Sequence, residues 1–255
     1  VRDNSPKKEN AGTIVLLHGY LESLDVWENF IPLLTDRYRV IAPDLPGHGI
    51  SEVKGEIHTM EFLADVVSGA LDTLGVEKCM LVGHSMGGYA ALEFLRKYPG
   101  RLDRFVLFHS TPDPDTDEKQ TQREREIAVI TGGKKELLMQ SPANGFAEDN
   151  RRKFADEIED LAEQIVLTDD HGIIALLRGM SERRDNNETM RGSDIPELMI
   201  FGRKDQYIRP ETARKVIDAQ PQAEVQWLEN SGHMGFIEEP ERSAAILTSF
   251  YSGLC

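Results

Sequence analysis

Cysteine is scarce in this sequence, and long apolar runs are absent. Only Cys79 and Cys255 occur among the 255 residues, and two cysteines do not make a disulfide framework. No stretch approaches the roughly 18 consecutive apolar residues of a membrane-spanning helix, so we expect no membrane span. Internal repeats and low-complexity tracts are also missing. These absences exclude a disulfide-stapled scaffold, a transmembrane protein and a repeat array.

Positive charge is also in short supply. The 29 lysines and arginines face 44 aspartates and glutamates, which gives a formal net charge of −15. Long-range repulsion opposes binding to nucleic acid and to anionic membranes, so we expect neither as a partner. The motifs H-E-x-x-H, paired C-x-x-C, P-loop and G-x-G-x-x-G are missing, so we expect no metal and no cofactor. The expected partner is a small-molecule substrate, and the sequence leaves the oligomeric state open.

No secretory signal peptide is recognisable, and the chain begins at Val1 rather than at a methionine. Removal of an upstream segment would leave such a start, so the missing signal does not exclude secretion. We expect a cytoplasmic protein. A length of 255 residues suits one large domain, or a core domain with an insertion, and can bury a sizeable hydrophobic core.

The most informative segment is residues 83–87, which read Gly-His-Ser-Met-Gly. The apolar run 79–82 predicts a buried strand before it, and the apolar spacing over 89–95 predicts a helix after it. A chain that turns from strand to helix so quickly forces its central residue into strained dihedrals and leaves no room for side chains on the flanking glycines. This setting is typical of a nucleophile elbow, with the Ser85 hydroxyl exposed at the tip.

Predicted strands and helices alternate on both sides of this elbow. Alternation predicts an α/β fold with a mostly parallel sheet, right-handed crossovers and helices on both faces. Residues 1–12 are polar, and we expect them to be frayed. The predicted strands cover 13–17, 38–42, 79–82, 104–108, 197–202 and 224–228, and the predicted helices cover 26–34, 60–74, 89–98, 211–219 and the residues from about 241.

The alternation stops between residues 111 and 194, where the chain is charged and helical. Helices are predicted over 117–131, 134–139, 146–166 and 172–183, with too many apolar residues for a solvated linker. We therefore expect a core domain in two parts, 1–110 and 195–255, interrupted by a helical cap insertion over 111–194. Because the insertion follows a strand that leads to the carboxyl edge of the sheet, we expect it to cover that edge.

A serine nucleophile needs a base, which a third group must orient. Among the seven histidines we favour His233, because it directly follows the last predicted strand, where a loop can carry its ring over the carboxyl edge of the sheet. His109 ends a strand at the same edge and is the alternative base. The other histidines are expected to be structural (His18, His48), on the surface (His58, His171) or turned away from the serine (His84).

The orienting acid should also follow a strand. Asp205 does so after residues 197–202, which gives the chain order serine, acid, histidine, and Asp113 is its rival. The oxyanion hole needs two converging backbone N–H groups. Met86, at the start of the elbow helix, supplies one, and Tyr20, in the loop after the first apolar strand, supplies the other.

Several further segments repeat a known family pattern, namely His18-Gly19, Asp44-x-Pro46-Gly47-x-Gly49-x-Ser51, residues 83–88, residues 202–205, and Gly232-His233 with Glu239-Pro240. As a set they resemble the α/β-hydrolase fold superfamily, in the capped branch of carboxylesterases, C–C bond hydrolases and cofactor-free perhydrolases. Serine at position 85 separates the chain from the similar epoxide hydrolases and haloalkane dehalogenases, which use aspartate. The family usually opens with an antiparallel hairpin, which the polar residues 1–12 cannot supply.

The resemblance implies a catalytic triad of Ser85, Asp205 and His233, with Tyr20 and Met86 as the oxyanion hole. The chemistry and the resemblance together favour a serine hydrolase of carboxylic esters or related carbonyl substrates, acting through an acyl-enzyme. Two alternatives remain open: a C–C bond hydrolase of a vinylogous diketone, and a triad-bearing small-molecule receptor of the same fold. The pocket is expected to hold an apolar acyl or aryl group between Tyr20, Leu21, Met86, His109, Tyr207, Met234 and parts of the insertion.

Overall fold

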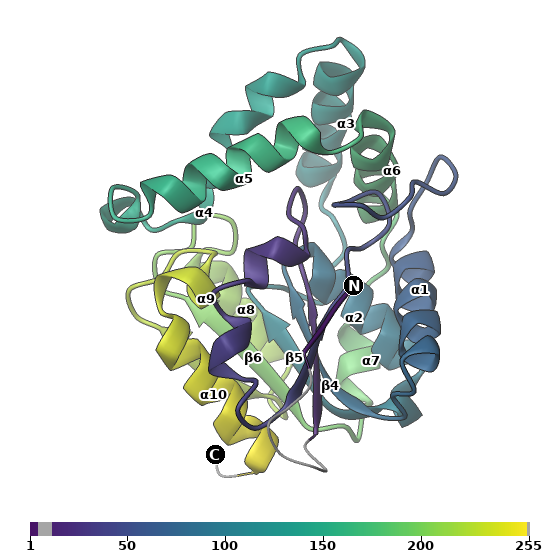
Figure 1. The fold of residues 1–255 in the computed structure, drawn as a ribbon, viewed down its shortest axis with the longest axis vertical. Helices are drawn as coiled ribbons and strands as arrows, with labels where there is room; N and C mark the ends of the chain where they lie inside the picture. Colours follow the sequence, from purple (N-terminus) through teal and green to yellow (C-terminus); the bar gives the residue numbers. More distant parts are fainter. Residues whose placement is uncertain (5–11, 254–255) are drawn as a thin grey trace.

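A seven-stranded sheet forms the centre of the molecule in the computed structural model, which describes residues 1–4 and 12–253 (Figure 1). Every neighbouring pair of strands is parallel except the pair of β1 and β3. The predicted α/β fold with a mostly parallel sheet is thereby confirmed. In spatial order the strands are β1 (Arg2–Asn4), β3 (Arg39–Ala42), β2 (Thr13–Leu17), β4 (Cys79–His84), β5 (Leu102–Phe108), β6 (Glu197–Gly202) and β7 (Glu224–Leu228).

Helices cover both faces of the sheet, because alternate residues of its central strands point to opposite sides and are buried on both. On β4, Leu81 belongs to the apolar core of one face, while Met80 and Val82 belong to the core of the other. The first face packs against α1 (Met60–Thr73), α2 (Met86–Lys97) and α8 (Pro210–Ala219). The second packs against η1 (Leu24–Trp27), η2 (Ile31–Leu33), α9 (Gly235–Glu238) and α10 (Pro240–Ser252), and the short η3 (Pro99–Arg101) precedes β5.

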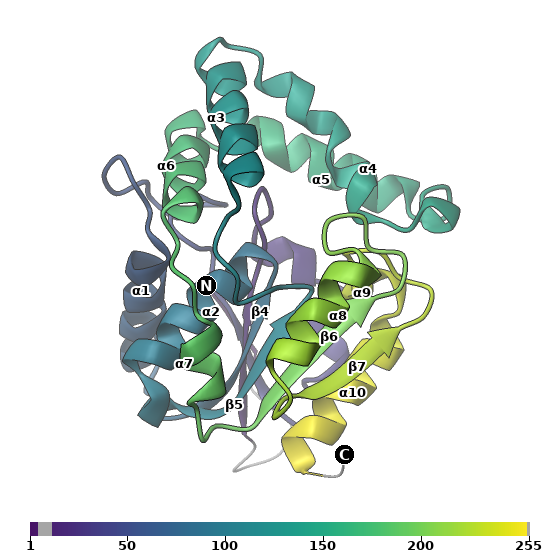
Figure 2. The same cartoon turned by 180° about the vertical axis from the view of Figure 1, so that it is seen from behind.

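The segment 111–194 is helical and extends from the carboxyl end of the sheet. Its helices α3 to α6 gather at one end of the molecule in both views, whereas α7 lies beside α2 at the side of the sheet (Figures 1 and 2). Local signals set the helix starts, since the Thr116 hydroxyl accepts the N–H of Lys119 at the start of α3. The elements are α3 (Asp117–Thr131), η4 (Lys135–Gln140), α4 (Pro142–Gly145), η5 (Glu148–Asn150), α5 (Ala155–Leu167), α6 (Asp170–Ser181) and α7 (Asn187–Arg191).

The amino-terminal residues differ from the expectation of a frayed end. Residues 2–4 form β1, which pairs antiparallel with β3, so that expectation was wrong for them. The Arg39 guanidinium binds the Asp3 carboxylate at 2.7 and 3.0 Å, which links the two strands by an ion pair. The rest of the segment expected to be frayed, over 5–11, and Cys255 lie outside the described residues. Cys79 is a buried free thiol, and within 1–4 and 12–253 no helix is long and apolar enough to cross a membrane.

The predicted helix over 26–34 is also different, because the structure has two 3-10 turns, η1 and η2, in its place. Pro32 lies inside the second turn, where a proline cannot donate the backbone hydrogen bond that a continuous α-helix requires. Trp27 and Phe30 are nevertheless fully buried, so the apolar spacing identified the buried face although the helix type was wrong.

Candidate active site

Ser85 lies at the turn between β4 and α2 in a strained backbone conformation. Its φ is 50° and its ψ is −115°, a region that non-glycine residues seldom adopt. Two contacts from the neighbouring strand hold this conformation. The Ser85 N–H donates to the carbonyl of Phe108 at 3.1 Å, and the Ser110 hydroxyl donates to the carbonyl of Ser85 at 2.8 Å.

The glycines around Ser85 are required by close backbone approach. A Cβ on Gly83 would lie 2.5 Å from the carbonyl oxygen of Gly87, and a Cβ on Gly87 would lie 2.5 Å from the carbonyl oxygen of Leu17 on β2. Such distances are far below any van der Waals contact, so only glycine fits at either position. Steric contacts therefore require glycine on both sides of the serine.

Asp205 and His233 meet in the loops that follow β6 and β7. Asp205 Oδ2 lies 2.7 Å from Nδ1 of His233, and its Oδ1 accepts the backbone N–H groups of Tyr207 and Ile208 at 2.8 and 2.9 Å. Burial raises the pKa of the Asp205 carboxyl, but the charges and hydrogen bonds of His233 and His109 outweigh it and hold that pKa well below its ordinary value. Asp205 is therefore an ionised acceptor that fixes the orientation of the His233 ring.

Of the two rival residues, Asp113 is engaged elsewhere, whereas His109 lies beside the acid, with Nδ1 3.5 Å from Oδ2 of Asp205. Asp113 accepts hydrogen bonds from Asn187 and Thr111, both at 2.9 Å. His109 is fully buried and accepts the N–H of Gly235 through Nε2 at 3.2 Å. Burial lowers the pKa of His109 to about 4, so this ring is neutral at ordinary pH. The prediction that His109 lines the pocket was wrong, because its ring stacks on Phe108 away from the cavity.

The loop after β2 leaves one backbone donor open beside the serine. The Gly19 N–H donates to Glu22 at 2.6 Å, and the Leu21 N–H donates to Nε2 of His48 at 3.1 Å. Between them, the Tyr20 N–H has no acceptor among the residues that the structure describes. Met86 is the first residue of α2, where backbone N–H groups lack intrahelical acceptors. Both donors belong to residues that line one cavity with Ser85, as an oxyanion hole requires.

Four further histidines, His18, His48, His58 and His171, divide into three groups. His18 and His48 are buried and accept backbone N–H groups through Nε2, which is a structural role. His58 was expected on the surface but is fully buried, because it donates to the carbonyl of Pro46 and accepts the N–H of Lys54. His171 is exposed, as its polar surroundings suggested.

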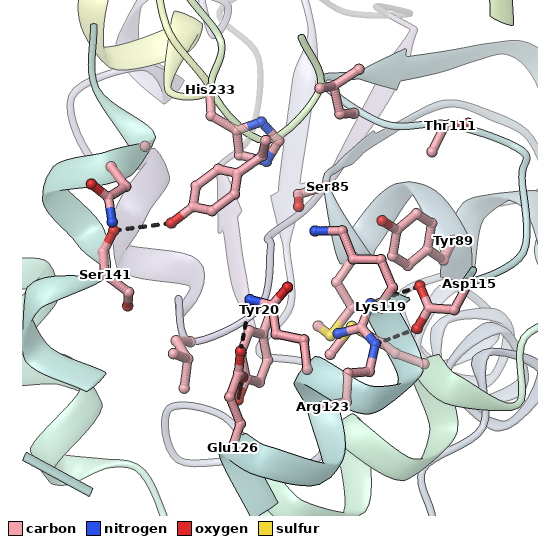
Figure 3. Close-up of a pocket in the computed structure, with 18 of the residues that line it drawn as sticks. Tyr20, Ser85, Tyr89, Thr111, Asp115, Lys119, Arg123, Glu126, Ser141 and His233 are labelled. Atoms are coloured by element: carbon pink, nitrogen blue, oxygen red, sulfur yellow. Dashed lines mark hydrogen bonds and ion pairs between the residues drawn. The ribbon is translucent and has the colours of Figure 1, made fainter. Parts of the chain in front are cut away.

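A cavity of about 410 Å³ opens in front of Ser85 and His233 and is lined by residues of both the core and the 111–194 segment (Figure 3). Of the predicted pocket residues, Tyr20, Leu21, Met86, Tyr207 and Met234 line it. One wall is apolar and combines side chains of the segment with side chains of the core. This wall consists of Leu138, Leu161, Ile165, Met180, Ile208 and Met234.

Another part of the cavity wall is polar, which the sequence did not reveal. Arg123 of α3 and Arg183 after α6 both pair with the carboxylate of Asp115. The Tyr20 hydroxyl donates to Glu126 at 3.3 Å, and burial raises the pKa of that carboxyl. Lys119 extends from α3 into the cavity toward Ser85 (Figure 3). Among the described residues, no carboxylate lies within 4.0 Å of its ammonium group.

One group of side chains in the site has the composition of a metal-binding cluster. His109, Asp205 and His233 each offer a ligand atom within 4.8 Å of the others. The hydrogen bonds between Asp205 and His233, and between Gly235 and His109, already account for this cluster without an ion. We therefore interpret it as part of a proton-transfer site.

Comparison with known proteins finds hydrolases among the proteins that are similar to this chain. The model of the alpha/beta hydrolase fold family matches residues 12–126. A 2-hydroxy-6-oxononadienedioate/2-hydroxy-6-oxononatrienedioate hydrolase of Paraburkholderia phymatum is 28% identical over 254 residues, which cover 93% of this chain and 86% of that protein. A pimeloyl-[acyl-carrier protein] methyl ester esterase of Aeromonas hydrophila is 27% identical over 249 residues, which cover 93% of this chain and 94% of that protein.

Solved structures agree in fold over almost the whole chain. A thermophilic esterase from Thermogutta terrifontis superposes with a TM-score of 0.92 at 28% identity, covering 99% of this chain and 92% of that one. An enol-lactonase from Burkholderia xenovorans superposes with a TM-score of 0.89 at 23% identity, covering 98% and 95%, and shows the likeness of fold alone. Esterases and a C–C bond hydrolase are thus both among the proteins that this chain resembles.

Proposed function

The chain belongs to the α/β-hydrolase fold superfamily and is an enzyme of that family, and from this premise we propose that it is a serine carboxylesterase of small-molecule substrates. The observation that carries the proposal is the strained Ser85 in the same cavity as His233, whose ring Asp205 orients at 2.7 Å. A serine hydroxyl is a weak nucleophile until such a base removes its proton. We propose that the enzyme works in the cytoplasm.

In the proposed reaction the Ser85 hydroxyl attacks the ester carbonyl carbon and passes its proton to Nε2 of His233. The new tetrahedral oxyanion accepts the N–H groups of Tyr20 and Met86. His233 then protonates the departing alcohol, which leaves an acyl-serine. Water attacks this intermediate by the same route, with His233 as base, and releases the carboxylic acid and free Ser85. Asp205 stays ionised throughout and stabilises the imidazolium.

We propose that α3 to α6 of the 111–194 segment cap this site and set the length of the acyl group. Leu161 and Ile165 of α5 and Met180 of α6 supply apolar surface opposite Ser85. Side chains that exclude water strengthen the interactions of the oxyanion, because the local dielectric falls. The small α7, packed beside α2, has no part in the proposed cap.

Ser85→Ala tests the proposal directly. Wild-type protein should hydrolyse p-nitrophenyl esters and react with a fluorophosphonate label, and the variant should lose both, with activity falling about 10³-fold or more. Ser141→Ala is the matched control, since Ser141 lines the same cavity away from the elbow, and it should keep the label. Labelling of Ser85→Ala would contradict the assignment of the nucleophile.

A C–C bond hydrolase is the second candidate, favoured by the resemblance to the nonadienedioate hydrolase. Such an enzyme should cleave a vinylogous diketone much faster than simple esters, so the ratio of the two kcat/KM values decides between the candidates. A receptor of this fold would bind its ligand with very slow turnover of either substrate. A single-turnover experiment with enzyme that reacts with the fluorophosphonate distinguishes such a receptor from an esterase that has been assayed on a poor substrate.

A further inference from the structure

A chain of hydrogen bonds starts at Glu22 in the lining of the cavity, and the proposed reaction does not use it. Glu22, which is 7% exposed, lies in the loop after β2 and accepts the Gly19 N–H through Oε2 at 2.6 Å. The same oxygen lies 3.1 Å from Nδ1 of the fully buried His84, the residue before Ser85. Nε2 of His84 lies 3.0 Å from the carbonyl oxygen of His233. The chain therefore joins the loop of the proposed oxyanion hole to the loop of the proposed base.

The partners of His84 fix where its protons lie. A carbonyl oxygen only accepts, so Nε2 of His84 donates to His233. Nδ1 faces the Glu22 oxygen that already accepts the Gly19 N–H, and a carboxylate satisfies both donors at once. Burial raises the pKa of the Glu22 carboxyl, but the charge and hydrogen bond of His84 and the Gly19 N–H outweigh it and leave that pKa below its ordinary value. The Glu22 carboxyl and the His84 imidazole are thus joined by a buried hydrogen bond.

The loop that carries Gly19 and Tyr20 packs directly against Glu22 and His84. A Cβ on Gly19 would lie 2.8 Å from Oε1 of Glu22 and 2.9 Å from Nδ1 of His84, so the oxyanion loop lies directly on both side chains. Leu21 has a φ of 63°, an uncommon value for leucine, and its N–H is fixed by His48. The loop is therefore pinned on each side of Tyr20.

We propose that Glu22 is a positioning residue, which holds the Tyr20 N–H and the His233 ring in the relative geometry that the transition state requires. The inference rests on the serine hydrolase function proposed above. Desolvation makes a buried carboxyl group a poor source of stability compared with packed apolar side chains, so a role in stability alone does not explain Glu22. The hydrogen-bond partners of the Glu22 carboxyl are the Gly19 N–H and Nδ1 of His84, and Glu22 acts through these two residues.

The test is a series of Glu22 variants assayed on one neutral p-nitrophenyl ester. Glu22→Ala should lower kcat about 10²-fold and change KM less than about threefold, because oxyanion contacts form only in the transition state. Glu22→Gln should retain most of kcat, since its amide oxygen can still accept from Gly19 and His84. Glu22→Asp keeps the charge but shortens the side chain by one methylene, so its kcat should fall as in Glu22→Ala. It replaces Glu22→Ala in the test if the alanine variant does not fold.

A second readout separates positioning from stability. An alkyl trifluoromethyl ketone, which forms a tetrahedral adduct on the serine, should bind Glu22→Asp more weakly by the same factor as kcat falls. The corresponding methyl ketone should bind as it does to the wild type. Glu197→Asp is the matched control, because Glu197 is a buried glutamate at the amino end of β6, away from the cavity, and it should leave kcat and both affinities unchanged.

Two results would overturn the inference. One is a Glu22→Asp or Glu22→Ala enzyme with a lowered melting temperature but wild-type kcat and ketone affinity. The other is a Glu22→Gln enzyme as impaired as Glu22→Asp, since the chain would then depend on charge rather than on position. Failure of the serine hydrolase function looks different, because wild-type protein would then show neither ester hydrolysis nor labelling of Ser85.

Discussion

The backbone N–H of His233 donates to the carbonyl oxygen of Gly145 at a distance of 2.6 Å. Gly145 ends α4, so the loop that carries the proposed base is bonded directly to the 111–194 segment. A Cβ on Gly232 would lie only 2.6 Å from the backbone nitrogen of Ala147, which shows how closely the two loops approach. The proposed cap and the base loop therefore form one packed unit rather than a lid over an independent site.

Asp205→Asn should lower kcat of ester hydrolysis about 10⁴-fold, because an amide leaves the His233 ring in the wrong tautomer. Asp113→Asn is the control, since its partners are Asn187 and Thr111 rather than a histidine, and it should change kcat less than about threefold. Steady-state kinetics on one ester give both values. The opposite ranking would move the acid to the loop after β5.

The proposed cap predicts a limit on acyl length. The value of kcat/KM should peak at short or medium esters and fall steeply for long ones, because Leu161 and Ile165 close the cavity. Leu161→Ala should raise kcat/KM for the first rejected ester about tenfold by relieving this steric limit. Leu137→Ala, at an exposed position of η4 outside the cavity, is the control. A flat chain-length profile in all three enzymes would remove the segment from substrate selection.

Lys119 predicts a modest preference for anionic esters. Lys119→Met should lower kcat/KM for an ester with a terminal carboxylate about threefold relative to its neutral isostere, the range expected of a solvated ion pair. The effect should disappear in about 1 M salt, where such pairs are screened. Arg125→Met removes the same charge from α3 outside the cavity and should leave the ratio unchanged. Equal effects of the two substitutions would indicate long-range attraction instead of a contact.

Glu197 predicts a pH dependence of stability. Burial raises the pKa of its carboxyl to about 7, while the unfolded chain has an ordinary glutamate. The folded state therefore binds the extra proton, and this contribution to stability is full below the unfolded pKa and is lost as pH rises toward 7. Glu197→Gln cannot lose a proton, so its melting temperature should rise relative to the wild type between pH 5 and 8. A constant difference across that range would contradict the shift.

Sequence patterns predicted the sheet and the elbow because both depend on residues that are close together in the sequence. Apolar runs identified the central strands, and the glycines at 83 and 87 reflect close contacts that no other residue tolerates. Asp205 and His233 were selected for their places after β6 and β7, and those strand ends do bring them to one point. Residues that follow neighbouring parallel strands thus lie close together at the carboxyl edge of the sheet.

Side chains whose partners are distant in sequence could not be predicted in this way. Glu22 looks like an ordinary turn residue, and only folding brings it to His84, 62 positions away. The same applies to His58, whose polar neighbours suggested exposure although α6 covers it, with a Cβ on Gly179 reaching 1.8 Å from its carbonyl oxygen. The polar wall of the cavity also depends on how α3 packs on α6, which apolar spacing alone does not specify.

The sharing of Asp115 between Arg123 and Arg183 bears on how such an enzyme can diverge. One carboxylate pairs with two guanidinium groups that already line the cavity and offsets one of their two positive charges, so a single Asp115→Asn change would release both groups. The wall would then carry an uncompensated positive charge close to the nucleophile, at a cost in stability that the rest of the fold must absorb. In this scaffold a single substitution therefore favours anionic over neutral substrates. Related enzymes can acquire different substrates in this way without any change of their catalytic residues.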